Sequence, residues 1–344
     1  MKIGFRNHPF LVNLSLLAAA LLLSAAAGPV FIPPGAVSRI LADQLPGIAL
    51  QQDWPQAFET ILLRIRLPHT ALMALAGAAL ASSGAAYQGV FRNPLADPYL
   101  IGVASGAGLG AVIAMSIRWP AEWRGLYPIP LAAFIGAVLT IALVYSIARV
   151  GQTLPTTTLI LAGVAVSSFA TSLTSFLMFR STSELRRAIG WMLGSSVLTG
   201  WEPFLVALPY AVIGMGALVI SGHALNVLQY GEEQAQQLGL SAERAKALIL
   251  VAASLTTATA VAFTGIIGFV GLIVPHFVRI LWGGDYRRLL PLSILGGAWF
   301  LLMADLLART LLAPQVLPVG IVTALAGAPF FLWVLRSAKG QAFW

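Results

Sequence analysis

Residues 91–98 read Phe-Arg-Asn-Pro-Leu-Ala-Asp-Pro, and this polar stretch joins two long apolar runs. Its two prolines end any helix, and a bilayer offers no partners for the backbone groups that they leave free. The stretch, called the elbow below, is therefore predicted to turn at a membrane surface. The apolar run that follows carries Gly102, Gly106 and Gly110. Because a four-residue step keeps these glycines on one helix face, they are predicted to let another helix backbone pack closely.

The composition places the rest of the chain in the membrane as well. Of its 344 residues, 58% are apolar and 9% are charged, and the mean hydropathy is +0.87. A soluble globular protein carries about 25% charged residues. About 200 apolar residues, at about 20 per span, correspond to about ten transmembrane helices. The sequence thus predicts an all-α, polytopic membrane protein with a single transmembrane domain over residues 1–344.

Prolines and charged residues divide the chain into ten predicted spans. The eighth is short and contains Pro275, and such a helix is tolerated at membrane depth only where protein or a water-filled cavity covers it. The predicted limits are 11–33, 62–86, 99–117, 127–149, 156–179, 203–221, 244–266, 268–283, 289–312 and 319–336.

The first span follows Lys2 and Arg6 and resembles a secretory signal peptide. We expect it to be a retained helix, because it is long enough to span and everything after it is membrane-embedded. Ten spans place both termini on one side. With the termini in the cytoplasm, eleven basic residues lie inside and nine outside, which is a weak positive-inside bias. The prediction is a multi-pass protein of the cytoplasmic (inner) membrane with both termini cytoplasmic.

The net charge of +8 has two interpretations. A nucleic-acid-binding surface would cluster the basic residues, but here they are scattered singly among apolar runs. Contacts with lipid headgroups and orientation signals explain them better. Membrane lipid is therefore an expected partner, and nucleic acid is not.

The sequence lacks the motifs of common enzymes. Its only lysines are Lys2, Lys246 and Lys339, so it has no P-loop for nucleotide phosphates, and neither Gly-x-Ser-x-Gly nor His-Glu-x-x-His occurs. With no cysteine and four widely separated histidines, no metal-ligand spacing is present. We predict no catalytic residue, no metal and no cofactor, and hence a transport subunit rather than an enzyme.

One acidic residue lies within a predicted span. Asp305 precedes Arg309 by four residues, a spacing that favours a local ion pair. Arg309 could instead bind a partner near the outer surface. A proton-coupled carrier would need a second buried acid, and none is evident in the sequence.

Hydroxyl residues are concentrated in the fifth and seventh spans. They can bond to the carbonyl four residues earlier and serve helix packing, or they can line a water-filled path for a polar cargo. The density in the fifth span favours the path. The residues are Thr156, Thr157, Thr158, Ser167, Ser168, Thr171, Ser172, Thr174 and Ser175 in the fifth span, and Ser254, Thr256, Thr257 and Thr259 in the seventh.

Residues 231–243 form a polar connector between two spans. The pattern predicts a short amphipathic helix that ends at a glycine, followed by a second turn from Ser241. The connector is either a solvated loop or a projection that another protein grips in a groove. A chain without ATP chemistry that displays such a projection fits a subunit driven by a separate motor.

Four ordered blocks between residues 60 and 336 closely resemble the permease subunits of bacterial ABC importers for iron–siderophores, haem and vitamin B12. The blocks are residues 92–107, 268–279, 304–309 and 317–330. The resemblance implies the type II ABC importer permease fold, in a homodimer of ten-helix subunits with the translocation path between the copies. It also implies separate cytoplasmic ABC ATPase subunits and an extracytoplasmic substrate-binding protein as partners.

The resemblance further implies roles for individual residues. The cytoplasmic gate would consist of Asn93, Leu95, Thr156 and Thr157; the ATPase-coupling segment, over about 231–243, would use Glu232, Gln236, Leu238 and Gly239; and Arg66 and Arg309 would pair with glutamates of the binding protein. One departure is His69, which stands where the vitamin B12 permease has a third arginine.

The resemblance gives the function as the permease of an ATP-driven importer for an iron–siderophore or related metal chelate. Vitamin B12 and haem are the alternative cargoes. A stand-alone secondary carrier and an intramembrane enzyme are less favoured, because paired membrane acids and a nucleophile–base arrangement are both missing from the sequence.

Overall fold

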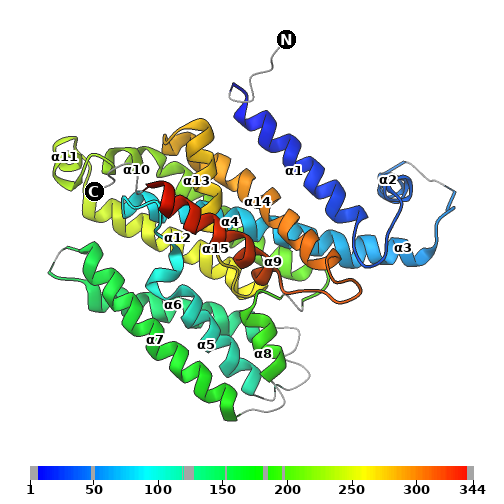
Figure 1. Cartoon of the computed structure of the whole chain (residues 1–344), viewed down its shortest axis with the longest axis horizontal. Helices are drawn as coiled ribbons and strands as arrows, with labels where there is room; N and C mark the ends of the chain where they lie inside the picture. The colour runs from blue at the N-terminus through cyan, green and yellow to red at the C-terminus, as the bar shows by residue number, and fades with distance from the viewer. Residues whose placement is uncertain are drawn as a thin grey trace.

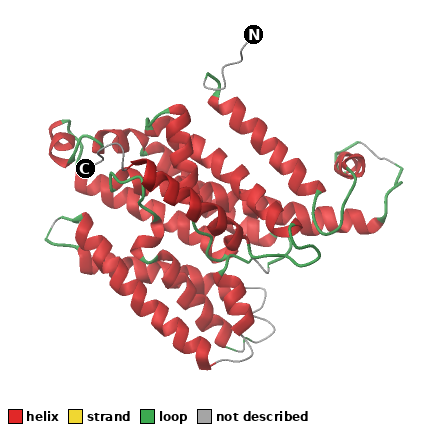
Figure 2. Ribbon diagram, in the orientation of Figure 1, coloured by secondary structure: helices red, strands yellow, loops and turns green. Residues whose placement is uncertain are grey.

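The computed structural model describes residues 7–47, 51–117, 119, 128–151, 153–180, 185–195 and 198–338. Over these ranges the regular structure is helical, and the one strand-like contact there is an isolated bridge between Val150 and Thr153 (Figure 2). The all-α prediction is confirmed. Five of the basic residues counted for the orientation lie outside the described ranges: Lys2, Arg6, Arg118, Arg124 and Lys339.

Seven helical segments in the described part of the chain are long and apolar enough to cross a membrane. They are α1 (Pro9–Ala26), the continuous α3, η1 and α4 (Gln56–Thr60, Ile61–Arg66 and Leu67–Val90), α6 (Pro128–Ala148), α7 (Thr156–Arg180), α9 (Glu202–Ile220), α12 (Ala242–Thr264) and α14 (Tyr286–Thr310). Three shorter apolar helices are α5 (Val103–Ser116), α13 (Val270–Trp282) and α15 (Val319–Ala338). Each predicted span contains one of these helices, which confirms the polytopic membrane architecture.

Short helices occupy the connections. They are α2 (Pro34–Asp43), η2 (Pro98–Ile101) after the elbow, α8 (Leu185–Met192), α10 (Gly222–Leu228) and α11 (Glu232–Gln237). In Figure 1, α11 and α2 lie at opposite ends of the molecule, which are called the α11 end and the α2 end below.

The central helix of the molecule is α4. It packs against α14, α12, α13 and α9, and every residue from Ala76 to Val90 is buried. Gly77 lies against Gly297 of α14, and a Cβ on either glycine would be 2.1 Å from the carbonyl oxygen of the other. A Cβ at Gly84 would likewise be 2.1 Å from the carbonyl oxygen of Gly271 in α13. Backbone thus packs on backbone, as small residues allow between membrane helices.

The helix after the elbow belongs to a second layer, formed by α5, α6 and α7 (Figure 1). A Cβ at Gly106 would lie 2.5 Å from the carbonyl oxygen of Gly136, and one at Gly110 would lie 2.0 Å from that of Ala132. Both glycines therefore face α6. Gly102 has a φ of +88°, a left-handed conformation that suits glycine, and it separates η2 from α5. The layer joins the core through α12, which contacts α5 and α6.

The short eighth span is α13. It begins after Phe269, whose φ of +69° is left-handed, and it contains Pro275. It packs against α4, α14 and α15, so protein covers its buried face. This cover is what a short, proline-containing helix needs at membrane depth.

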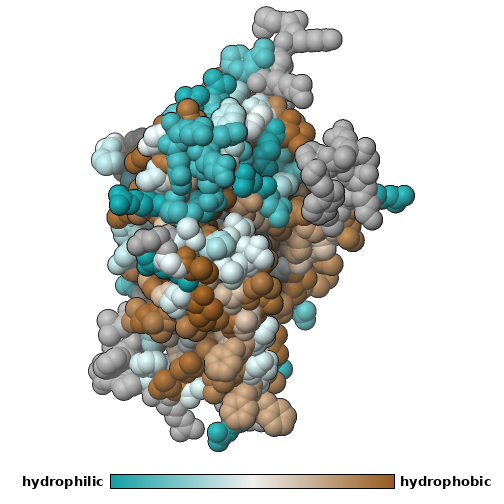
Figure 3. Space-filling view, turned by 90° about the vertical axis from the view of Figure 1, so that its left-hand side faces the viewer, coloured by the Kyte–Doolittle hydropathy of each residue, from teal (hydrophilic) through white to brown (hydrophobic). Residues whose placement is uncertain are grey.

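The outer helices present large apolar side chains to their surroundings. Examples are Leu22 in α1, Leu139 in α6, Phe169 in α7 and Ile213 in α9, all of which are exposed. Figure 3 looks at the α11 end, where hydrophilic residues gather on the upper part of the view and hydrophobic residues on the lower part. A surface of this kind fits lipid around the outer helices and water at the α11 end.

Candidate functional site

The elbow closes on itself through backbone and side-chain hydrogen bonds of one residue, Asn93. After α4 ends, Arg92 adopts a left-handed φ of +48° and the Asn93 N–H donates to the carbonyl oxygen of Gln88 at 3.1 Å. The Asn93 side chain then accepts the N–H of Leu95 at 2.9 Å, and its backbone carbonyl accepts the N–H of Ala96 at 3.1 Å. Asn93 therefore shapes the turn that carries Leu95, and its own side chain lies on the exposed side.

The end of the elbow is fixed to the loop before α13. Asp97 accepts the N–H of Tyr99 at 2.8 Å and so caps η2, and the Tyr99 hydroxyl donates to the carbonyl oxygen of Ile267 at 2.9 Å. Asp97 lies outside the spanning helices, and burial raises the pKa of its carboxyl to about 6. The elbow is thus held at both of its ends.

The predicted gate threonines lie at the start of α7. Thr157 is exposed and Thr156 half-buried, while Thr158 donates to the carbonyl oxygen of Ala148 at 3.0 Å. Among the described residues, no hydrogen bond joins these threonines to the elbow. The two segments instead meet through η2, because Gly163 of α7 packs so closely that a Cβ there would lie 2.2 Å from the carbonyl oxygen of Leu100.

The predicted coupling segment consists of the short helix α11, a turn at Gly239 and the start of α12, in agreement with the sequence pattern. α11 ends at Gln237, and Gly239 has a φ of +84° that the helix cannot continue. The N–H groups of Gly239 and Leu240 donate to the carbonyls of Gln236 and Ala235, which is a glycine-ended C-cap, and α12 starts at Ala242. Glu232 and Gln236 are also exposed.

Leu238 is the most prominent side chain of this connector. It is 67% exposed in the turn after α11, whereas Ala235 of α11 is buried. The Leu238 side chain is therefore accessible to a partner.

Side-chain amides attach the α11 region to the core. Gln229 donates to the carbonyl oxygen of Gly89 at the end of α4 at 2.9 Å. Asn226 of α10 donates to the carboxylate of Asp285 at 2.6 Å and accepts the N–H of Tyr286 at 2.9 Å. The region is therefore bonded to α4 and to the start of α14.

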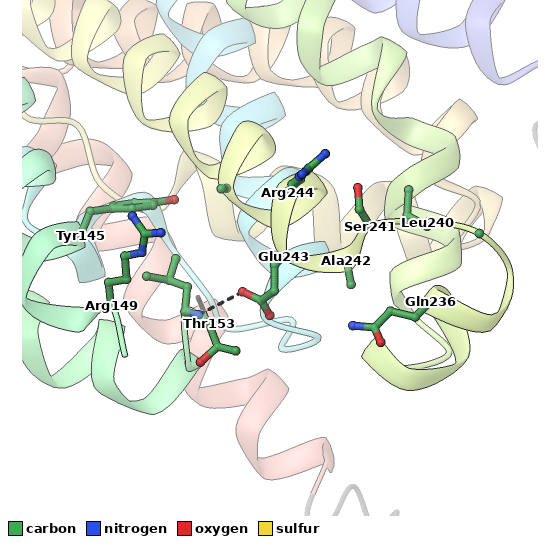
Figure 4. Close-up of a pocket in the computed structure, with 12 residues that line it drawn as sticks. Tyr145, Arg149, Thr153, Gln236, Leu240, Ser241, Ala242, Glu243 and Arg244 are labelled. Atoms are coloured by element: carbon green, nitrogen blue, oxygen red, sulfur yellow. Dashed lines mark hydrogen bonds between the residues drawn. The ribbon is translucent and has the colours of Figure 1, made fainter. Parts of the chain in front are cut away.

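A buried lysine forms a second attachment. The Lys246 ammonium lies 2.8 Å from the Glu232 carboxylate of α11 and 2.6 Å from the Glu243 carboxylate of α12. The second oxygen of Glu243 accepts the N–H of Leu154 at 3.0 Å, drawn as the dashed line in Figure 4. These contacts connect α11, α12 and the turn before α7.

A cleft lies beside this network (Figure 4). It has a volume of about 720 Å³ and separates the end of α6 from the turn after α11. In the close-up, Tyr145 and Arg149 approach from α6, Gln236 from α11, and Glu243 lies between them. Beside this cleft, the Glu243 side chain joins the start of α12 to the turn before α7.

The arginines predicted to contact a binding protein lie near the α2 end, inside the protein. Arg66 is 5% exposed, and it donates to the carbonyl oxygens of Ala25, Ala26 and Val30, with distances of 3.1 and 2.8 Å for the first two. These bonds attach the chain after α1 to the start of α4. In this structure the Arg66 guanidinium faces the interior of the subunit.

Arg309 takes part in a buried polar cluster. It is 8% exposed, pairs with Asp305 at 2.8 Å, and donates to the Ser24 hydroxyl at 2.8 Å. The local ion pair predicted from the four-residue spacing is therefore confirmed. The other oxygen of Asp305 lies 2.9 Å from His69, and Ser24 bonds to Thr70 at 2.9 Å. The cluster joins α1, α4 and α14.

The two hydroxyl-rich spans differ in their surroundings. In α12, Ser254 and Thr257 are buried, each bonds to the carbonyl four residues earlier, and Ser254 also bonds to Tyr87 at 2.6 Å. In α7, Ser168 and Ser172 bond in the same way but are exposed. The α12 hydroxyls serve packing, as does the buried Thr174 of α7, whereas Ser168 and Ser172 lie on an exposed face of α7.

With this geometry described, comparison with known proteins identifies the family. A model of the FecCD transport family matches residues 16–337. The chain belongs to the FecCD transport family. It is a multi-pass membrane permease of the ABC importer type, and this family membership implies partnership with an ATPase and a binding protein.

Relatives of this FecCD permease carry different named cargoes. The cobalamin import system permease protein BtuC of Halobacterium salinarum is 46% identical over 293 residues, covering 85% of this chain and 78% of the relative. The hemin transport system permease protein HmuU of Yersinia pestis is 41% identical over 288 residues, covering 82% and 84%. A solved metal-chelate type ABC transporter in an inward-facing conformation is 30% identical, with a TM-score of 0.80, and covers 95% of this chain and 98% of that chain.

Several residues of the FecCD site were not predicted. The hydrogen bond between Glu243 and Leu154 joins segments far apart in sequence, and so do the side-chain hydrogen bonds of Asn226 and Gln229. No local sequence pattern reveals these contacts. The Glu243–Lys246 pair has three-residue helical spacing, which is a signal that the sequence did offer. His69 was noted only as a departure from the family, not as a partner of Asp305.

Proposed function

We propose that the chain is the membrane subunit of an importer for a bulky metal chelate, with an iron–siderophore as the first candidate. The observation that carries this proposal is the chemistry of the relatives' cargoes. Cobalamin and hemin each hold a metal in a large organic ring, and the solved relative is of the metal-chelate type. Vitamin B12 and haem remain the alternative cargoes for this chain.

The path is proposed to lie between two copies of the subunit. Ser168, Ser172 and Ser175 follow one another at helical spacing and are exposed on α7, with their hydroxyls bonded to their own helix. These bonds make the serines tolerable in lipid, but a stripe of exposed hydroxyls also suits the wall of a water-filled path, which is the role proposed for it. A hydroxyl wall without charge suits a cargo that passes without tight binding.

The α11 end is proposed to be cytoplasmic and to carry the ATPase contact. Its support is the hydrophilic surface in Figure 3 and the exposed Leu238 beyond α11. Glu232, Gln236 and Gly239 would form the rest of the contact, and ATP hydrolysis would reside in the separate subunit. With this orientation we propose that both chain termini are cytoplasmic and that the permease lies in the inner membrane.

The gate is proposed to involve the elbow and the start of α7. Asn93 and Leu95 lie on a turn fixed to the core, and Thr156 and Thr157 begin a helix that packs on η2. Both segments are at the α11 end. Movement of α7 relative to the elbow would open or close this end of the path between the copies.

Docking of the binding protein is proposed at the α2 end. Arg66 and Arg309 support it indirectly, since both fix the chain after α1, from Ala25 to Val30, on the subunit surface. Direct pairing with acidic residues of a binding protein would require either guanidinium to exchange a present partner. Replacing each arginine by lysine and measuring binding-protein affinity would separate these contributions.

Reconstitution tests the proposed function. The subunit, its ATPase and its binding protein would be placed in liposomes, and ferric siderophores, hemin and cobalamin compared as cargoes and as stimulators of ATP hydrolysis. Uptake of one chelate that requires ATP and the binding protein is the expected result. Uptake driven by an ion gradient without the ATPase would contradict the proposal.

A further inference from the structure

The α11 region and the start of α7 are linked by a continuous set of polar contacts. From α11, Glu232 contacts Lys246 at 2.8 Å, and Lys246 contacts Glu243 at 2.6 Å. Glu243 then accepts the N–H of Leu154 at 3.0 Å. Two residues after Leu154, α7 begins at Thr156. Every link in this path is a charged group or a hydrogen bond to one.

Burial makes the central link strong. Lys246 is 5% exposed, although a lysine is rarely buried unless it is paired. Its ammonium is held between two carboxylates, so neither Glu232 nor Glu243 can move away without leaving a buried charge short of a partner. The cation between them also offsets the repulsion of the two carboxylates. The three side chains therefore move as one unit.

The last link acts on the backbone rather than on a side chain. Glu243 holds the N–H of Leu154, and the next residue is Pro155, which has a fixed φ and no N–H. A displacement of Glu243 should therefore displace the first turn of α7 by a similar amount. Glu243 lies beside the cleft between α6 and α11, and its side chain joins α12 to the turn before α7 (Figure 4).

We propose that Glu232, Lys246 and Glu243 form a relay that carries movement of α11 to the start of α7. The relay rests on the proposed function, in which α11 contacts the ATPase and Thr156 and Thr157 belong to the gate. These three are positioning residues, since none is proposed to touch the cargo. The elbow has a separate attachment through Gln229 and Gly89, so the relay governs only the α7 side of the gate.

Lys246→Gln tests the relay in the assembled permease and ATPase. Gln is too short to reach both acids, and the freed carboxylates repel each other. A spin label at position 157 in both copies reports the distance across the gate before and after ATP binding. We expect Lys246→Gln to retain ATPase association and to lose most of the ATP-induced change in that distance. Cargo moved per ATP hydrolysed should fall about tenfold, roughly 1.4 kcal/mol of coupling.

Three further variants guard against a purely structural effect. Arg288→Gln removes an exposed cation from the same end of the molecule and should leave the label response unchanged. Lys246→Arg retains the cation and should restore at least half of the lost response. Glu243→Gln keeps an acceptor for Leu154 but removes the charge, and it should give an intermediate response.

The two proposals fail in different ways. If Lys246→Gln shows the same ATP-induced change in label distance as the wild type, the relay is wrong. The proposed importer function is unaffected by that result. Loss of response in Arg288→Gln as well also overturns the relay, because the effect would then be general. A wild-type subunit that does not assemble with any ATPase overturns the proposed function and the relay together.

Discussion

At the residue scale, two kinds of position carry unusual constraints: a carboxyl in the elbow and glycines at helix crossings. Asp97 caps η2 although burial raises its pKa to about 6. Gly110 has no room for a side chain, because a Cβ would be 2.0 Å from the carbonyl oxygen of Ala132. Each position makes a prediction that a single substitution can test.

The carboxyl of Asp97 should make stability depend on pH. Because its pKa is raised on folding, the folded state binds the proton more tightly, and stability falls as pH rises from about 4 to about 6. Asp97→Asn keeps the acceptor for Tyr99 and removes the buried charge. We expect higher stability at pH 7, by up to about 3 kcal/mol, and a flatter profile. Thermal unfolding of the detergent-purified subunit at pH 4.5 and 7.5 measures this.

Asp285 provides a control, because its ionisation should change folding stability with pH in the opposite direction. Hydrogen bonds from Arg287, followed by one from Asn226, hold the pKa of the Asp285 carboxyl well below its usual range. Its ionised form therefore favours folding at neutral pH, and that contribution is lost as pH falls below about 4. Asp285→Asn should lower stability at pH 7. If both variants shifted stability in the same direction, the assignment of Asp97 would be wrong.

Gly110→Ala should separate α5 from α6. The added methyl would meet the backbone of Ala132 at 2.0 Å, and backbone cannot yield as a flexible side chain does. We expect a loss of about 2 kcal/mol or more, seen as a lower melting temperature and poorer expression. Gly216→Ala is the matched control, since it lies in α9 with nothing within 4 Å of its Cβ. That variant should be neutral or slightly stabilising.

At the element scale, α11 combines exposure with firm attachment. Its outer side and the following Leu238 are free, while Gln229, Asn226 and Lys246 fix the region to three other parts of the core. A small helix fixed in this way can pass a force from a partner to the spans instead of absorbing it. Its surface and its attachments are therefore separable by mutation.

Leu238→Asp should abolish the ATPase contact without unfolding the subunit. The side chain is 67% exposed, so a carboxylate there costs the folded state little, but it cannot enter an apolar groove. We expect loss of ATPase co-purification with an unchanged melting temperature. Leu45→Asp, at another exposed leucine beyond α2, should retain the ATPase. Normal ATPase co-purification with Leu238→Asp would remove α11 from the interface.

Most helices could be predicted from the sequence, but few of their contacts could. Apolar runs of span length predict the long helices, and the two prolines predict the position of the elbow. Both predictions succeed because these signals are local in the sequence. α2 was missed: it follows Pro33 and Pro34 and buries only Val37, Ile40 and Ala36, which is a weak pattern in an apolar chain. The inward direction of Arg66 and Arg309 depends on carbonyls and hydroxyls contributed by α1, which no spacing reveals.

At the scale of the whole molecule, the two ends are built differently. The α11 end has a hydrophilic surface and carries the connector of residues 231–243. Near the α2 end, a buried polar cluster attaches α1 to the core. There, Asp305 bonds to both His69 and Arg309, and Arg309 bonds to Ser24. Because α1 is largely exposed along its length, this cluster at its second end and the bond from Trp299 to Asn13 near its first end both attach it to α14.

Asp305→Asn should loosen α1. Removing the charge leaves Arg309 buried without its anionic partner, which costs about 3 kcal/mol when a buried pair is broken. We expect a lower melting temperature and faster proteolysis in the chain between α1 and α2. Asp53→Asn breaks an exposed pair with Arg39 and should cost less than about 1 kcal/mol. Equal losses in the two variants would show that the cluster contributes no more than a surface pair.

The glycine contact between α4 and α14 has a consequence for how the protein is made. Gly297 follows Gly77 by 220 residues, so the ribosome completes α4 long before its main partner exists. From Ala76 to Val90 the helix is rich in alanine, serine and glycine, and it is poorly suited to lipid on its own. During synthesis it must be sheltered by the insertion machinery or by α9 and α12 until α14 arrives. Chains truncated before α14 should therefore be recognised as unfinished and degraded.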